Sequence, residues 1–203
     1  MTKEKILISL FLVFSGAAAR IFMVEFFQVP NFEIVTALAL IAGAFLGGAF
    51  FFIIPLGIIS ISDIYLGNTS ILIFTWSAFI IIGFFGWLLR KNRAFNCSFV
   101  AKMTAAGVIS SLFFYLYTNF GWWLLSNMYP PTLGGLMHCY VAGLPFLKNT
   151  LLGNLFFVPV LVSLSLLAQK YYPAFQSMIK KLFGLRILIR AFLKIKNGIH
   201  LYS

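Results

Sequence analysis

IVTALALIAGAFLGGAFFFIIPLGIISIS, residues 34–62, is an apolar run without a single charged side chain. As one helix it would be about 44 Å long at 1.5 Å per residue, which exceeds the roughly 30 Å hydrocarbon core of a bilayer. As two passes that turn near Gly47-Gly48, each half would be only about 21 Å long and short for the bilayer. The side of the membrane on which every later loop lies depends on which alternative is right.

The composition predicts an all-α protein, a polytopic membrane helical bundle. The 203 residues are 62% hydrophobic and 9% charged, and the mean hydropathy is +1.00. Soluble domains carry about 25% charged residues, and a chain of this length has too little interior to hide so much apolar surface. A transmembrane β-barrel would show alternating segments of about ten residues, whereas the apolar runs here are continuous.

The positions of the basic residues favour two passes through residues 34–62. Residues 70–89 form a clear span, and Arg90, Lys91 and Arg93 follow it. If the N-terminus is cytoplasmic, two passes put these cations inside, as the positive-inside rule prefers, whereas one pass puts them outside. We therefore expect the two-pass alternative.

Further spans are expected at residues 103–126 and 150–169, which gives six crossings of the cell (inner) membrane with both termini cytoplasmic. Thirteen of the 15 Lys and Arg residues then lie inside, and Arg20 and Lys148 lie outside. The basic residues lie at segment ends and in the tail and do not form a basic face of a soluble domain, so the net charge of +11 does not indicate nucleic-acid binding.

The first apolar run, residues 6–19, allows two interpretations. Its basic start and the triplet Ala17-Ala18-Ala19 are typical of a cleavable signal peptide. The apolar run nevertheless continues past Arg20, whose long side chain can reach the membrane surface. We expect the segment to be retained as the first helix of a six-helix transmembrane domain, residues 1–170.

The tail, residues 171–203, is expected to differ from this domain. Pro173 is predicted to end the last span. Arg186, Arg190 and Lys194 repeat every four residues and share one helical face, which indicates a basic amphipathic helix on the anionic inner leaflet. The alternative is that this face binds the acidic groove of a partner.

No set of residues predicts an enzyme. The sequence contains no H-E-x-x-H, G-x-S-x-G or P-loop motif, and it has no Cys/His spacing typical of zinc. His138 and Cys139 are adjacent, so their side chains do not converge as a base and a nucleophile. We expect no catalytic residue, no metal and no cofactor.

Asp63 is the strongest candidate for a functional residue, because an acid at membrane depth is expected to have a role and a partner. Arg20 is its obvious countercharge. Solvation at the interface and capping of a turn are the alternative explanations for Asp63. Residues 118–154 contain aromatic rings with polar groups at their edges, which are typical of a small-molecule pocket. We predict one outer cavity, lined by Asp63, Asn119, Trp122, Tyr129, His138 and Tyr140. The alternative for the aromatic residues is an interfacial belt that faces the lipid headgroups.

Two groups of motifs resemble those of one protein family. The first comprises Pro30-Asn31-Phe32, Ala37, Ala42-Gly43-Ala44, Pro55, Ser62-Asp63 and Leu66-Gly67. The second comprises Ser110-Ser111, Phe113-Phe114, Thr118-Asn119-Phe120, Trp122-Trp123, Tyr129-Pro130, Thr132, Gly135-Leu136, Cys139-Tyr140, Ala142, Leu144-Pro145-Phe146, Thr150-Leu151 and Gly153. Over about residues 15–165 the chain resembles an uncharacterised bacterial membrane family that is similar to the substrate-binding S components of energy-coupling factor (ECF) transporters.

This resemblance implies that the chain captures a vitamin or another micronutrient from outside. Asn31 and Asn154 fall at outer ends of spans in the expected topology, so they are further candidates to bind the substrate. The resemblance also implies a transmembrane coupling protein and cytoplasmic ATPases as partners, with small residues of the first helix, Gly16, Ala17, Ala18 and Ala19, at the contact. Gly153-Asn154 stands where the family leads us to expect Gly-Asp, which argues against proton or cation coupling there. The alternative is a membrane scaffold or assembly subunit, and an intramembrane enzyme is a more distant third.

Overall fold

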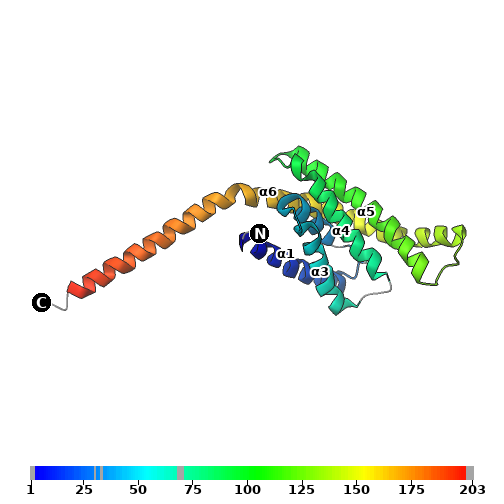
Figure 1. Cartoon of the computed structure of the whole chain (residues 1–203), viewed down its shortest axis with the longest axis horizontal. Coiled ribbons are helices and arrows are strands. Elements are labelled where there is room, and N and C mark those ends of the chain that lie inside the picture. The colour runs from blue at the N-terminus through cyan, green and yellow to red at the C-terminus, as the bar shows by residue number, and fades with distance from the viewer. Residues whose placement is uncertain (1–2, 30, 33, 68–70, 200–203) are drawn as a thin grey trace. The chain divides into compact units, whose positions relative to one another are not determined.

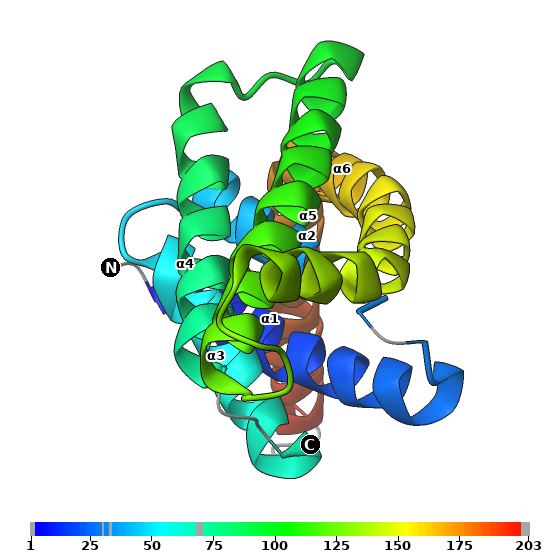
Figure 2. The same ribbon diagram turned by 90° about the vertical axis from the view of Figure 1, so that its right-hand side faces the viewer.

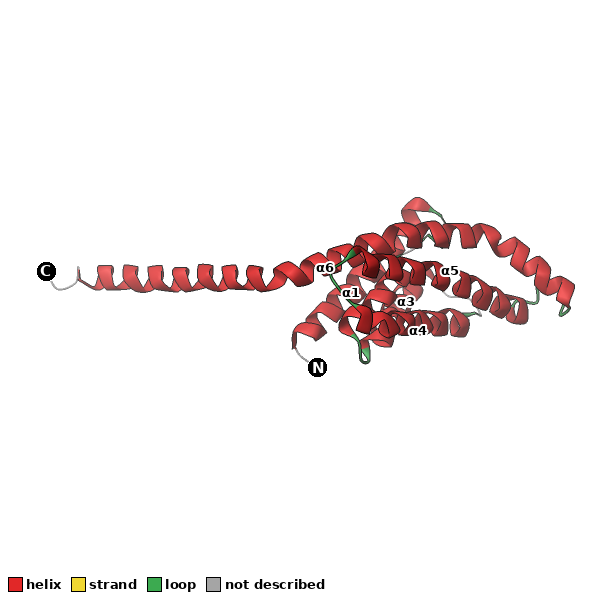
Figure 3. Cartoon of the chain, turned by 90° about the horizontal axis from the view of Figure 1, so that it is seen from above, coloured by secondary structure: helices red, strands yellow, loops and turns green. Residues whose placement is uncertain are grey.

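The structure is a computed structural model that describes residues 3–29, 31–32, 34–67 and 71–199, with side chains up to residue 173. This part of the chain consists of helices and their connections (Figure 3). In chain order the elements are α1 (Lys3–Phe22), η1 (Met23–Phe27), α2 (Val35–Ile41), η2 (Ala42–Leu46), α3 (Phe50–Leu66), α4 (Leu72–Leu89), η3 (Arg90–Asn92), α5 (Cys97–Leu125) and α6 (Leu133–Ile199). The chain divides into two compact units, residues 1–163 and 164–203, and the tail expected from residue 171 lies within the second.

Four helical segments of the described chain are long and apolar enough to cross a membrane. They are Lys3–Phe27, Leu72–Asn92, Cys97–Leu125 and Leu133–Pro173. Two shorter apolar helices, Val35–Leu46 and Phe50–Leu66, lie between the first and the second of these segments. The chain is therefore a helical membrane protein, as its composition predicts.

The chain turns between η2 and α3 at Gly47-Gly48, where the two-pass alternative places the turn. Both glycines have a positive φ, +64° and +56°, which residues with a side chain adopt only at a cost. The Gly47 N–H donates to the carbonyl of Ala42 at 3.0 Å and closes the end of η2. The prediction that residues 34–62 form two helices rather than one is confirmed.

Helix α4 packs against α2, α3 and α5 (Figures 1 and 2), and glycines make the first two contacts very close. A β-carbon on Gly86 would overlap the backbone carbonyl of Leu40, and one on Gly83 would overlap that of Phe51. Gly43 in η2 faces the Gly83 carbonyl in the same way. Small residues of this kind let helix backbones approach in lipid, where close packing and not a hydrophobic difference drives association.

The connection between α5 and α6 is shorter than expected. Helix α5 ends at Leu125 and α6 begins at Leu133, so the last helix begins well before Thr150, the residue at which the last span was expected to start. The Thr132 hydroxyl accepts a hydrogen bond from the Gly135 N–H at 3.1 Å and caps the new helix. With this cap in place, the apolar residues that follow continue as helix.

Helix α6 runs through Pro145, Pro159 and Pro173, so Pro173 does not end the helix, although the last candidate span is Leu133–Pro173. A proline removes one hydrogen bond, but in apolar surroundings the remaining backbone groups still need their helical partners. Figure 2 shows that α6 changes direction within its yellow-green to yellow part, and proline is a common cause of such a bend. The expected basic face of the tail lies beyond the described side chains.

The small residues of α1 serve the packing of this chain. Gly16 and Ala17 are buried, and a β-carbon on Gly16 would lie 2.8 Å from the Ile58 side chain of α3. The implied partner contact at Gly16–Ala19 therefore needs correction, because its first two residues are already covered from within the chain. Ala18 is exposed and Ala19 is half-buried.

Candidate functional site

A half-buried ion pair joins the last turn of α1 to the last turns of α3. Arg20 Nη1 lies 2.6 Å from Asp63 Oδ1 and also donates to the Ser62 hydroxyl at 2.6 Å. The side chains are 20% and 9% exposed, respectively. Charged hydrogen bonds at this distance are strong, and together they offset part of the free energy that it costs to remove both charges from water.

Trp76 of α4 holds the other oxygen of the same carboxylate. Its indole Nε1 donates to Asp63 Oδ2 at 2.9 Å. Asp63 is thus bonded from two different helices, one on each side, which fixes the orientation of the carboxylate. The expected pairing of Arg20 with Asp63 is present, and Trp76 is a partner that the sequence analysis missed.

A cavity of about 130 Å³ adjoins this ion pair. Its polar lining comes from Arg20, Asn31, Asp63, Thr75 and Thr118, and its apolar lining from Ile59, Ile71, Phe79 and Phe114. Helices α1, α3, α4 and α5 contribute, so the cavity exists only when these helices are assembled. A lining of apolar side chains with a few polar groups is typical of a small-molecule site, although such pockets usually measure roughly 300–1,000 Å³.

The buried Ser110 adds a polar atom on the same face of α5. Ser110, Phe114 and Thr118 follow one another at intervals of four residues and therefore share one side of the helix. Ser110 Oγ is buried and has no hydrogen-bond partner among the described residues. A buried hydroxyl without a partner has a cost in free energy that a bound water or ligand removes.

Three of the predicted binding residues, Arg20, Asn31 and Asp63, line this cavity. The other predicted residues are not among those that line it, so this cavity does not bring Asp63 together with the predicted aromatic residues. These others are Asn119, Trp122, Tyr129, His138, Tyr140 and Asn154.

Several of these residues join α5 to α6. The Tyr140 hydroxyl donates to the Leu116 carbonyl at 3.2 Å, and the Tyr115 hydroxyl donates to the Tyr140 carbonyl at 2.6 Å. The Cys139 thiol donates to the backbone carbonyl of Asn119 at 3.3 Å. The side-chain amide of Asn119 donates to the backbone carbonyl of Tyr115 in its own helix. Their role in the structure is therefore to hold the two helices together.

Asn154 has a similar role deeper in the same pair of helices. It is 1% exposed and donates from Nδ2 to the Ser111 hydroxyl at 2.7 Å. Of the remaining predicted residues, His138 is exposed at the start of α6, while Trp122 and Tyr129 are half-buried. None of these four lines the cavity beside Asp63.

Besides Trp76, the residues of this site that were not predicted from the sequence are Ile59, Ile71, Thr75, Phe79, Phe114 and Thr118. Thr118 is the first residue of the polar and aromatic stretch 118–154, from which the cavity was expected to draw its lining. No signal in the sequence favours it over Asn119 as a cavity residue, because both are polar and the direction in which each leaves the helix decides which of them lines the cavity.

Fold and site together define a helical membrane protein with an ion pair beside a small polar cavity. The chain belongs to a family of unknown function, DUF6580, whose sequence model matches residues 1–175. No curated protein and no solved structure matches the chain. The matched range includes every residue of the cavity.

Proposed function

We propose that this protein is a substrate-binding membrane subunit, similar to an S component, that captures a small polar molecule from the outer side for an uptake transporter. The observation that carries the proposal is the Arg20–Asp63 pair on the wall of a polar cavity. Charged residues within membrane segments are costly and typically mark substrate pathways. The coupling protein and ATPases that would drive uptake are separate partners, because the chain contains no P-loop.

The size of the cavity sets the class of ligand. A volume of about 130 Å³ equals the liquid volume of roughly four water molecules, so it accepts a small solute. The guanidinium and the Asn31 amide can donate hydrogen bonds, while Asp63 and the threonine hydroxyls can accept them. A ligand as large as a vitamin would require the helices around the cavity to move apart.

The orientation in the membrane follows from where the charges gather. Lys5 and Arg93 both bond to carbonyls at the end of η2, whereas Arg20 and Asp63 meet at the opposite end of α1 and α3. The positive-inside rule assigns the first end to the cytoplasm and the ion pair to the outer side. Six crossings are consistent with this assignment if α2 together with η2 forms one pass and α3 forms another.

Cysteine labelling tests this topology. Cys97 is exposed, but Cys139 is only 2% exposed, so the exposed His138 is the better position for a second reporter. In a Cys139→Ala chain, we expect an impermeant maleimide to label Cys97 only after the membrane has been opened. In a Cys97→Ser, Cys139→Ala, His138→Cys chain, we expect labelling in intact cells. Labelling of both reporters from one side would contradict the topology.

Replacing Thr118 by valine tests the binding site. Thr118 lines the cavity and also bonds to the Phe114 carbonyl of its own helix, as Thr104 does to Val100 outside the cavity. The ligand is first identified by mass spectrometry on the purified protein, and its affinity is then measured by equilibrium dialysis. We expect Thr118→Val to weaken binding about three- to tenfold and Thr104→Val to leave it unchanged. Equal effects of the two substitutions would mean that the cavity is not the site.

A membrane scaffold without a ligand is the second candidate function. The glycine contacts between α2, α3 and α4 and the small volume of the cavity favour it, because a rigid bundle suits an assembly subunit. The scaffold predicts that the purified protein carries no small molecule and co-purifies with other membrane proteins. A stoichiometric ligand that Thr118→Val displaces would contradict it.

A further inference from the structure

A second group of charges surrounds the turn between η2 and α3, at the end of the bundle remote from Asp63. Lys5 Nζ donates to the Leu46 carbonyl at 3.3 Å, and Arg93 Nη1 donates to the carbonyls of Phe45 at 3.1 Å and Ala44 at 3.3 Å. The carbonyl end of a helix carries partial negative charge, so these two cations stabilise the end of η2. Burial lowers the pKa of Arg93, and the positive charge of Arg90 nearby lowers it further.

Arg90 is the third cation at this turn, and its side chain does not share in these bonds to the end of η2. Its guanidinium lies against Gly47, so close that a β-carbon on this glycine would overlap it. Among the described residues the Arg90 side chain has neither a hydrogen bond nor an ion pair. A guanidinium has five N–H donors in a planar fork that matches the oxygens of a phosphate or a carboxylate.

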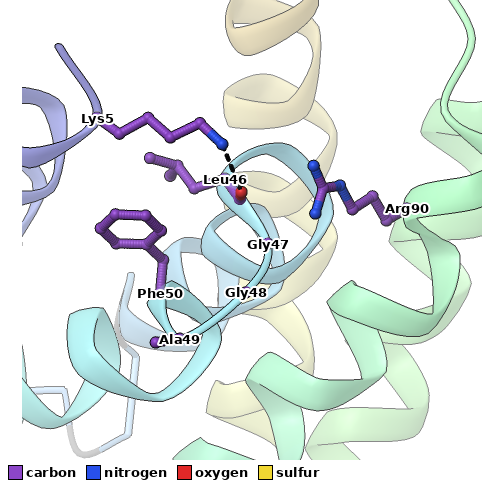
Figure 4. A pocket seen from close by; sticks show the side chains of 7 residues that line it. All are labelled: Lys5, Leu46, Gly47, Gly48, Ala49, Phe50 and Arg90. Carbon is purple, nitrogen blue, oxygen red and sulfur yellow. Dashed lines mark hydrogen bonds between the residues drawn. The ribbon is translucent and has the colours of Figure 1, made fainter. Parts of the chain in front are cut away.

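Arg90 and Lys5 face each other across a cavity of about 480 Å³ that opens at the surface. Figure 4 shows the two side chains on opposite sides of the Leu46–Gly47 turn, with Phe50 on the side of Lys5. Leu46, Ala49 and Phe50 supply apolar lining, and none of the described residues that line the cavity is acidic. Lys5 uses one of its ammonium donors on Leu46, which leaves others for a bound group.

We propose that this cavity binds the phosphate group of an anionic phospholipid of the inner leaflet. Among the described residues these two cations have no acidic partner, so an anion is the complementary ligand, and the apolar lining next to them fits the glycerol and acyl part of a lipid better than a free phosphate ion. The cytoplasmic leaflet is rich in anionic lipids, and its surface potential attracts basic residues at this depth. The bound lipid joins α1 to α4 through Lys5 and Arg90 and thereby stabilises the turn between them. This inference is independent of the outer cavity.

Arg90→Gln, with Lys91→Gln as its control, tests the site. Both residues lie in η3 and lose the same charge, but Lys91 does not line the cavity. The full chain, purified in detergent, is mixed with phosphatidylglycerol or phosphatidylcholine, and native mass spectrometry counts the retained lipid. We expect one phosphatidylglycerol per wild-type chain, at least about tenfold weaker retention in Arg90→Gln and Lys5→Gln, and no change in Lys91→Gln. Equal loss in Lys91→Gln would overturn the proposal in favour of diffuse attraction.

The wild-type chain alone distinguishes the sources of the phosphate. Its melting temperature is measured with phosphatidylglycerol, with phosphatidylcholine and with inorganic phosphate. We expect stabilisation by phosphatidylglycerol only. Stabilisation by inorganic phosphate that phosphatidylglycerol does not exceed would assign the cavity to a soluble phosphate ester and overturn the lipid proposal. Equal stabilisation by both lipids would also overturn it, and neither result depends on whether the variants fold.

Discussion

Gly86→Ala is expected to destabilise the folded bundle by roughly 1–3 kcal/mol or more, even though alanine is the better helix former. The added β-carbon would overlap the backbone carbonyl of Leu40 in α2. A backbone group cannot swing aside as the end of a flexible side chain can. Helices α2 and α4 must therefore move apart, and they lose close contacts along their whole interface.

Gly134→Ala is the matched control for this prediction. Gly134 lies in the first turn of α6, and a β-carbon there would meet only the Thr132 hydroxyl, at 3.8 Å. In this open space the substitution should be neutral or should stabilise the chain by up to about 1 kcal/mol through helix propensity. Thermal unfolding of both variants in the same detergent measures the difference. If Gly86→Ala melts as late as Gly134→Ala, the close approach of α2 and α4 is wrong.

Removing one member of the Arg20–Asp63 pair is expected to cost about 3–5 kcal/mol of stability, because the other charge is left in poorly solvated surroundings. Arg20→Met leaves a carboxylate that is only 9% exposed, and Asp63→Leu leaves a guanidinium that is 20% exposed. Lys148→Ala is the control, since this cation is exposed at the same side of the proposed topology. Unfolding of the three variants in detergent gives the comparison, and a loss in Arg20→Met no larger than in Lys148→Ala would contradict the prediction.

The double variant Arg20→Met, Asp63→Leu separates stability from binding. Apolar residues that replace both members of a buried pair often restore most of the stability, so the double variant should unfold later than either single variant. Binding of the ligand in the outer cavity should nevertheless be lost in all three. A double variant that binds normally would show that the pair is structural and has no part in the proposed site.

The ion pair could be predicted because an apolar chain offers few alternatives. Asp63 was the acid expected at membrane depth, and Arg20 was one of only two cations expected on the outer side. Trp76 could not be predicted as the third member, since its indole reaches Asp63 only because α4 packs beside α3. The aromatic residues of the stretch 118–154 do not line the cavity beside Asp63, and their chemistry suits a ligand as well as it suits an interhelical contact.

The amino-acid sequence by itself determined the class of protein, the two helices within residues 34–62 and their turn at Gly47-Gly48. These features are local: an apolar backbone must satisfy its own hydrogen bonds, which only a helix does within one segment, and two glycines permit the positive φ of the turn. Tertiary structure alone decided which side chains share a cavity. Thr118 faces Asp63, while its neighbour Asn119 faces α6, because successive residues leave a helix about 100° apart and only the placement of the surrounding helices gives each direction its contacts.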